Sequence, residues 1–237
     1  MNIKILYDNS TLDDELFYGW GFSCLINDNI LFDTGENGEN LLSNMNKMKV
    51  DILNIEKVVI SHDHWDHTGG LWELLKNTKD LDVYGCPGFS SVFKKRVAVD
   101  NGRFIENSDL KKISDNMYLT EKMYGIHKFM PIEEQALIII TEKGITVITG
   151  CAHPGILKIL EIVKKRFPEE NIHCVLGGFH LTEHKKSSIE NIAKQFRKMN
   201  IQKAAPCHCS GEETKEIFKN NFGNDFIDVN VGEEIEI

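Results

Sequence analysis

Residues 61–70 read SHDHWDHTGG, and this stretch decides how the chain is interpreted. It places three of the nine histidines and two aspartates within six positions. Imidazole and carboxylate groups are the usual ligands of zinc and related divalent ions, so the cluster is typical of a metal or catalytic site rather than of a polar surface loop. Residues 57–60 form a short apolar run that predicts a buried strand just before it. Four potential ligands lie in this stretch: His62, His64, Asp66 and His67. They are too close together for all of them to bind one ion without strain, but they can bind two adjacent ions.

Other motifs follow the same order as in a known family. The string HDHWDH resembles the HxHxDH signature of the metallo-β-lactamase superfamily. ILFDTG (30–35) resembles its first motif, TGCAH (149–153) its third, and PCHC (206–209) its last. The resemblance covers residues from about 20 to 210. The segments GWGFS, GCAHPGI, GGFHL and APCHCSG are similar to one branch, often labelled metal-dependent hydrolase or dihydropterin-ribofuranosylaminobenzene-phosphate synthase.

This resemblance implies a dinuclear metal centre. One ion would be held by His62, His64 and His153, and the other by Asp66, His67 and His208. Asp33, where the strand of the first motif ends, would hold the metal ligands in position without binding the ions itself. We expect two divalent ions. Zinc is the preferred metal, and manganese and iron are alternatives.

The fourth motif departs from the family pattern. The superfamily usually has a bridging aspartate there, whereas this chain reads VLGGFHL (175–181). His180 stands near the expected place as a substitute ligand, a proton donor, a substrate contact or a packed histidine, and we expect a proton donor. The missing carboxylate puts the occupancy of the second ion in question. Cys151, Cys207 and Cys209 flank the expected ligands, where packing is favoured over a role as soft ligands or redox-active thiols.

The resemblance implies an α+β fold, a four-layer αββα sandwich of two mixed sheets flanked by helices, formed by residues 1–237 as one domain. Periodicity in the sequence predicts the individual elements, although residues 88–116 carry little signal. The expected strands are 3–6, 22–26, 30–32, 57–60, 81–84, 117–120, 136–141, 145–149, 174–176, 203–205 and 226–229. The expected helices are 40–48, 70–76, 90–96, 156–166, 187–199 and 211–221.

Composition limits the partners. The net charge of −9 over 237 residues argues against nucleic acid, whose binding proteins usually carry a basic patch. No apolar run approaches the roughly 20 residues of a membrane helix, and the first residues lack a signal-peptide core. We therefore expect a cytoplasmic protein with six reduced cysteines and a small-molecule substrate. Whether it forms a homo-oligomer is left open.

The expected activity is hydrolysis. A hydroxide held by the metals would attack an ester, lactone or phosphoester, with Asp66 as ligand and proton acceptor and His180 as donor to the leaving group. One alternative is a biosynthetic synthase that acts on a ribofuranosylaminobenzene phosphate in pterin cofactor assembly. Two others are a di-iron redox protein and a metal-dependent binding module without turnover. His127 is a further candidate for substrate contact.

Overall fold

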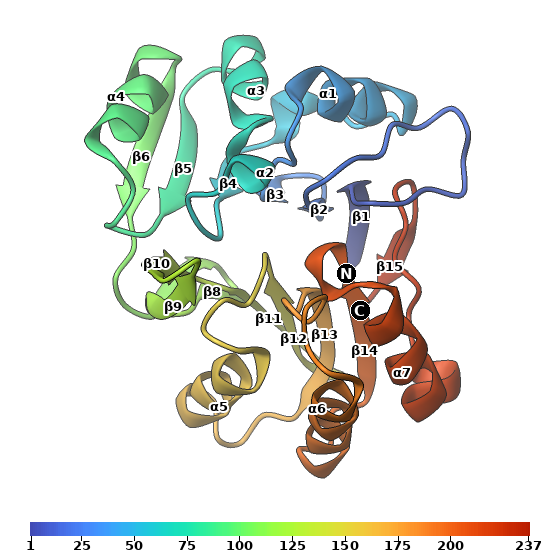
Figure 1. Cartoon of the computed structure of the whole chain (residues 1–237). Helices are drawn as coiled ribbons and strands as arrows, with labels where there is room; N and C mark the ends of the chain where they lie inside the picture. Colours follow the sequence, from blue (N-terminus) through green and yellow to red (C-terminus); the bar gives the residue numbers. More distant parts are fainter. The chain divides into compact units, whose positions relative to one another are not determined.

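The computed structural model describes all residues from 1 to 237 (Figure 1). Internal contacts divide the chain into two compact units, which are residues 1–108 with 230–236 (unit 1) and residues 109–229 with 237 (unit 2). Each unit contains one main mixed sheet, a set of helices and its own hydrophobic core. The expectation of a single domain over residues 1–237 stays a prediction. None of the helices has both the length and the apolar character needed to cross a bilayer.

Unit 1 is built on a seven-stranded sheet in the order β15-β1-β2-β3-β4-β5-β6. The first four strands in this order pair antiparallel, while β3, β4, β5 and β6 are parallel neighbours. The carboxyl ends of these parallel strands therefore lie at one edge of the sheet, where α/β sheets usually place their ligands. The strands are β1 (Asn2–Tyr7), β2 (Ser23–Ile26), β3 (Ile30–Phe32), β4 (Lys57–Val59), β5 (Leu81–Gly85), β6 (Gly102–Glu106) and β15 (Glu234–Glu236).

The helices of unit 1 pack their apolar stripes on this sheet. Leu41 of α1, Leu74 of α3 and Phe93 of α4 belong to one buried cluster with strand residues such as Val58 and Val83. Asn37 and Ser90 supply the side-chain caps that begin α1 and α4. The helices are α1 (Gly38–Lys47), the short α2 (Trp65–Thr68), α3 (Leu71–Asn77), α4 (Ser91–Val99) and the 3₁₀ turn η1 (Ile52–Asn54).

Unit 2 is built on a six-stranded sheet in the order β14-β13-β12-β11-β8-β7. Strands β12, β13 and β14 are parallel and the others antiparallel. Every residue of β13 is buried, as expected for a central parallel strand. The strands are β7 (Lys111–Ser114), β8 (Met117–Leu119), β11 (Leu137–Thr141), β12 (Gly144–Thr149), β13 (Ile172–Gly178) and β14 (Lys203–Cys207), with a separate hairpin of β9 (Met123–His127) and β10 (Met130–Glu134).

Three helices cover the core of unit 2, together with the 3₁₀ turns η2 and η3. The rings of Phe179, Phe196 and Phe218 pack with centroids 5.1 to 5.6 Å apart. Aromatic pairs at this spacing stabilise a core beyond the area they bury. The elements are α5 (Ile156–Arg166), α6 (Lys186–Lys198), α7 (Glu212–Phe222), η2 (His208–Ser210) and η3 (Gly223–Asp225).

The expected fold class, α+β with two mixed sheets and helices, is confirmed, but some elements differ. The predicted last strand at residues 226–229 is wrong. Phe226 makes only an isolated bridge to Ala204 after a 3₁₀ turn, and the last strand is β15, which pairs with β1. The β9–β10 hairpin was missed because its turn, at Lys128 and Phe129, has positive φ at two residues without the glycine or asparagine that signals such turns.

Candidate metal centre

In unit 1, the side chains singled out by the sequence gather where β3 and β4 end. Asp33 follows β3 directly, and its backbone N–H donates to Val59 O of β4 at 2.8 Å. Residues 61–64 follow β4 as a loop, and α2 then carries Asp66 and His67. The pairing of two parallel strands thus brings Asp33 to a loop about thirty residues later in the chain.

Asp33 is fully buried and organises this loop. Its Oδ1 accepts from the Ser61 backbone N–H at 2.7 Å, and its Oδ2 accepts from the Ser61 hydroxyl at 2.7 Å. Nδ1 of His67 lies 2.6 Å from the same Oδ2. Burial raises the pKa of Asp33, although the interactions with His67 and Ser61 oppose the rise. A carboxylate that holds Nδ1 fixes the imidazole so that Nε2 is the ligand atom, as is usual for metal-binding histidines.

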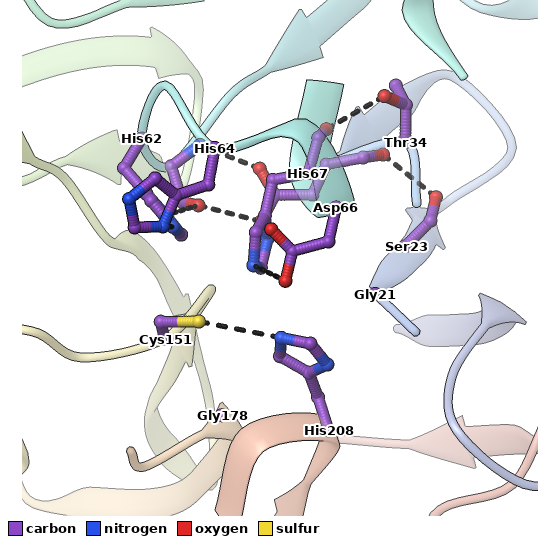
Figure 2. Close-up of polar contacts among 12 residues, drawn as sticks. Gly21, Ser23, Thr34, His62, His64, Asp66, His67, Cys151, Gly178 and His208 are labelled. Carbon is purple, nitrogen blue, oxygen red and sulfur yellow. Dashed lines mark hydrogen bonds and ion pairs between the residues drawn. The ribbon is translucent and has the colours of Figure 1, made fainter. Parts of the chain in front are cut away.

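The other donors of the loop lie beside His67 (Figure 2). Nε2 of His62 is 3.0 Å from Nδ1 of His64, and the rings of His62 and His67 have centroids 4.2 Å apart. Asp66 is buried, with Oδ2 3.7 Å from Nε2 of His67. Gly21 allows this packing, because a Cβ there would lie 2.4 Å from Asp66 O. Unit 1 therefore presents three imidazoles and a carboxylate, a donor set that suits divalent ions such as zinc.

In unit 2, the predicted residues gather at the carboxyl ends of three parallel strands. His153 follows β12, His180 follows β13, and His208 follows β14. Ala152, His180 and His208 have positive φ of 62°, 53° and 49°, and Asp33 in unit 1 has 53°. Non-glycine residues hold this conformation at a cost, and such positions concentrate at functional sites.

Glu134, at the end of β10, plays the part in unit 2 that Asp33 plays in unit 1. Its carboxylate accepts from the backbone N–H groups of Cys151, Ala152 and His153 at 3.2, 2.7 and 2.8 Å. Its Oε2 also lies 3.0 Å from Nδ1 of His153. Burial would raise the pKa of Glu134, but the bonds to His153 and to these N–H groups lower it overall. A carboxylate at Nδ1 orients the imidazole in the way usual for histidines that bind a metal through Nε2.

Two buried thiols lie among these histidines. Cys151 Sγ is 3.4 Å from Nε2 of His208, and Cys209 Sγ donates to Cys151 O at 3.7 Å. Burial raises the pKa of Cys209, but its hydrogen bonds with Cys151 and His180 and the charge of His208 bring it well below the ordinary value. The hydrogen bond with Cys209 raises the pKa of His180. His127 joins the group, its ring centroid 5.4 Å from that of His153.

The residues present in both units fit divalent metal ions, and the comparison with known proteins agrees. A model of the metallo-β-lactamase superfamily matches residues 23–167. The chain belongs to the metallo-β-lactamase superfamily. Membership of this metal-dependent superfamily implies divalent metal binding and an enzyme-like fold, which agrees with the imidazole and carboxylate donors described above.

Three relatives in the superfamily are similar over most of the chain. The crystal structure of Tm1679, a metal-dependent hydrolase of the β-lactamase superfamily, is 30% identical and superposes with a TM-score of 0.83 over 100% of this chain and 99% of that one. An uncharacterized protein of Methanocaldococcus jannaschii is 30% identical over 99% of this chain and 100% of its own. The 7,8-dihydropterin-6-methyl-4-(beta-D-ribofuranosyl)-aminobenzene-5'-phosphate synthase of the same organism is 26% identical over 87% of this chain and 84% of its own.

The structure places the predicted residues in two groups, one in each unit. Unit 1 brings together Asp33, His62, His64, Asp66 and His67, and unit 2 brings together His153, His180 and His208. That the two groups jointly hold a pair of ions stays a prediction. His173 does not belong to the unit 2 group, because it lies at the start of β13 whereas His180 follows its end. Its Nδ1 lies 2.9 Å from Gln202 Oε1. His184 is exposed.

Glu134 is a candidate site residue that the sequence analysis did not identify. Its only local signal is the acidic pair Glu133–Glu134 just before a strongly apolar strand, and nothing in that pair distinguishes the buried member from its neighbour. The side chain of Glu133 instead forms an ion pair with Lys122 at 3.0 Å. Only the contact with the loop of His153 reveals which carboxylate has a role.

Proposed function

We propose that this protein is a dinuclear-metal hydrolase that cleaves an ester, lactone or phosphoester of a small molecule. The observation that supports this proposal is a pairing of a carboxylate with a histidine that occurs once in each unit. In each unit a buried carboxylate holds Nδ1 of an imidazole, Asp33 with His67 at 2.6 Å and Glu134 with His153 at 3.0 Å. Carboxylate–histidine pairs of this kind orient metal ligands and raise their basicity. Two such pairs in a metallo-β-lactamase fold favour a metal centre over packed histidines.

The ligand assignment follows the motif order. We assign His62, His64 and His153 to one ion, and Asp66, His67 and His208 to the other. Zinc suits this mixture of imidazole and carboxylate, with manganese and iron as alternatives. Bound divalent ions polarise a carbonyl or phosphoryl oxygen and lower the pKa of coordinated water to about 7.

The side chains themselves supply positioning and proton transfer. Asp66 is only 6% exposed and has both a ligand role and, in this proposal, the role of proton acceptor. Asp33 and Glu134 keep two imidazoles in the tautomer that leaves Nε2 for the ion. His180 was expected to donate a proton to the leaving group, and that role requires its ring to be released from the hydrogen bond with Cys209.

The net charge and the cysteines bear on the class of substrate and on the cellular compartment. A net charge of −9 disfavours nucleic acid, so we propose a small-molecule substrate. None of the six cysteines forms a disulfide, and all six are buried. Reduced thiols of this number favour the cytoplasm as the compartment of the reaction.

A second candidate function comes from one relative. The synthase of Methanocaldococcus jannaschii is 26% identical, and its name specifies a ribofuranosyl-aminobenzene 5'-phosphate product. The same centre would then act on a phosphorylated ribosyl-aminobenzene and a pterin. Incubation of the purified protein with that pair tests this function, and the absence of a condensed product contradicts it.

The main proposal is tested by metal analysis of the purified protein followed by a panel of ester, lactone, thioester and phosphodiester substrates. We expect about two equivalents of zinc, turnover of at least one substrate class, loss of turnover with a chelator and recovery with zinc. His64→Ala removes a ligand and should abolish turnover. Asp63→Asn, in the same loop but exposed, is the matched control and should retain it.

Three outcomes contradict the proposal. Full turnover by metal-free His64→Ala protein would remove the metal from the reaction. Metal content without turnover on any class would favour a binding module. Iron-loaded, coloured protein that consumes oxygen without hydrolysis would favour a di-iron redox protein.

A further inference from the structure

Unit 2 contains a second group of potential metal ligands, none of which the proposed function assigns to an ion. Cys151 follows β12, His180 follows β13, and Cys209 lies in η2 after β14. Their ligand atoms, two sulfurs and one ring nitrogen, all lie within 4.8 Å of one another. His180 lies in the fourth motif, where this chain lacks the aspartate that the superfamily pattern predicts.

The spacing is compatible with one ion. Bonds of about 2.3 Å to sulfur and about 2.0–2.1 Å to nitrogen place the donors of a tetrahedral zinc site about 3.3–3.8 Å apart. The three atoms therefore need to approach by about 1.5 Å at most. A neighbouring pair, Cys151 Sγ and His208 Nε2, is already 3.4 Å apart. Rotation of a thiol about its Cα–Cβ bond supplies movement of this size.

The surroundings fix the backbone at these residues. Thr182 Oγ1 donates to Cys209 O at 2.7 Å, and the Leu181 backbone N–H donates to the same oxygen at 3.2 Å. Gly178 makes room for the thiol, because a Cβ there would lie 2.7 Å from Cys209 Sγ. His180 itself has a φ of 53°, a conformation that costs energy for a non-glycine residue. All these contacts lie within unit 2.

Burial and hydrogen bonding point to an absent partner. Cys151 and Cys209 are 3% and 5% exposed. Nδ1 of His180 is buried and has no hydrogen-bond partner, which is costly for a ring nitrogen. The imidazole of His180 is thus not held by hydrogen bonds at both ring nitrogens, and it can act as a metal ligand.

We propose that unit 2 by itself binds one thiophilic divalent ion, Zn²⁺ or its substitutes Co²⁺ and Cd²⁺, through the sulfurs of Cys151 and Cys209 and the imidazole of His180. Two S–H bonds break and two metal–sulfur bonds form, and two protons are released to solvent for each ion bound. Thiolate donors select these ions over Mn²⁺ and Mg²⁺. Three protein ligands leave a fourth position open. Of the roles considered for His180, this proposal selects that of ligand.

The test is a titration of the reduced, metal-free full-length protein with Co²⁺, read by the sulfur-to-cobalt charge-transfer absorption in the near ultraviolet. Imidazole and carboxylate ligands alone do not give this band. We expect the band in wild-type protein and in the double variant His62→Ala/His64→Ala, saturating at one equivalent. Cys151→Ser and Cys209→Ser should each lower the band by about half and weaken Co²⁺ binding by at least the roughly 10- to 100-fold that loss of a residue behind a ligand typically costs. Cys174→Ala is the matched control, since Cys174 is also fully buried in unit 2, and should leave the band unchanged.

A second measurement needs no variant and covers the case in which the serine variants fail to fold. Wild-type protein is alkylated slowly with and without Cd²⁺, and the modified peptides are quantified. We expect Cd²⁺ to protect Cys151 and Cys209 at least tenfold more than Cys174, and Mn²⁺ to protect neither. Equal protection of all three cysteines would overturn the proposal, because it would reflect general stabilisation.

The outcomes separate this inference from the proposed function. A charge-transfer band in a protein without hydrolytic activity leaves the sulfur site in place and removes the hydrolase. Hydrolysis by a zinc-loaded protein that gives no such band with Co²⁺ does the reverse. A band that survives both Cys151→Ser and Cys209→Ser overturns the sulfur site, since another cysteine would then be the ligand.

Discussion

The two units of this protein assemble their candidate ligands in opposite ways. Unit 1 draws three imidazoles and a carboxylate from the six consecutive residues 62–67, fixed from behind by Asp33. Unit 2 draws its histidines from the ends of three parallel strands, near residues 153, 180 and 208, and places thiols among them. The first donor set suits borderline ions and the second suits thiophilic ones. One chain thus contains a local ligand cluster and a distributed one, and the two differ in their chemistry.

The buried carboxylates of the two units also differ. Asp33 accepts one backbone N–H, one hydroxyl and one imidazole, and burial still raises its pKa. Glu134 accepts three backbone N–H groups and one imidazole, and its pKa is lowered. The additional backbone donors stabilise the ionised form enough to outweigh burial. We therefore expect Glu134 to contribute more to the stability of its loop in unit 2 than Asp33 contributes to its loop in unit 1.

The largest expected effect tests the catalytic part of the unit 1 cluster. Asp66→Asn removes a proposed ligand and proton acceptor, so kcat on the best substrate of the panel should fall about 100- to 10,000-fold. Steady-state kinetics with zinc analysis of the same samples measures this. Asp63→Asn, three residues earlier and exposed, should stay close to wild type. An Asp66→Asn enzyme with unchanged kcat would mean that Asp66 is neither a required metal ligand nor the proton acceptor of the reaction.

The next effect tests how much Glu134 contributes to the stability of the folded protein. Glu134→Ala leaves the N–H groups of residues 151–153 without their acceptor, and the free energy of unfolding should fall by about 3–5 kcal/mol. Urea unfolding of the metal-free protein measures the change. Glu133→Ala removes only the ion pair with Lys122 and should cost less than about 1 kcal/mol. Similar losses in the two variants would show that the loop of unit 2 is held by something other than this carboxylate.

A smaller effect tests the orienting role of Asp33. Asp33→Asn weakens the hold on Nδ1 of His67, so zinc affinity should fall about 10- to 100-fold, as measured by competition with a chromophoric chelator. Ser23→Ala is the control, because the Ser23 hydroxyl donates to the backbone oxygen of Asp33 rather than to its carboxylate. If both variants bind zinc like wild type, Asp33 serves the fold and not the ligand.

The smallest effect compares the two carboxylates through pH. Because the pKa of Asp33 is raised, its contribution to stability is complete below its unfolded pKa of about 3.9 and is lost as pH rises through the folded value. Because the pKa of Glu134 is lowered, its contribution is complete above its unfolded pKa of about 4.3 and is lost as pH falls through the folded value.

Unfolding of the metal-free protein between pH 3 and pH 7 measures this difference. The stability lost in Asp33→Asn should shrink as pH rises, whereas the stability lost in Glu134→Gln should grow. Parallel curves for the two variants would contradict the opposite pKa directions.

Much of the fold followed from local patterns. The helix at 156–166 was predicted to the residue because its apolar positions recur at helical spacing. The strands predicted at 136–141 and 145–149 lie at 137–141 and 144–149, and they were found because β-branched residues flank a glycine turn. The strand predicted at 226–229 failed because its residues follow a 3₁₀ turn and pair with β14 only through the isolated bridge of Phe226 to Ala204. The final pairing, β15 with β1, joins the two ends of the chain, which no local window can indicate.

The sequence by itself determined the superfamily and the ligand cluster at residues 62–67, because those donors are neighbours along the chain and their spacing is visible in one line of letters. Only the tertiary structure decided that Glu134 holds His153 and that Cys151, His180 and Cys209 lie together. Parallel pairing of β12, β13 and β14 brings strand ends about thirty residues apart to one edge of a sheet, and that proximity depends on strand order and burial rather than on the residues next to each ligand.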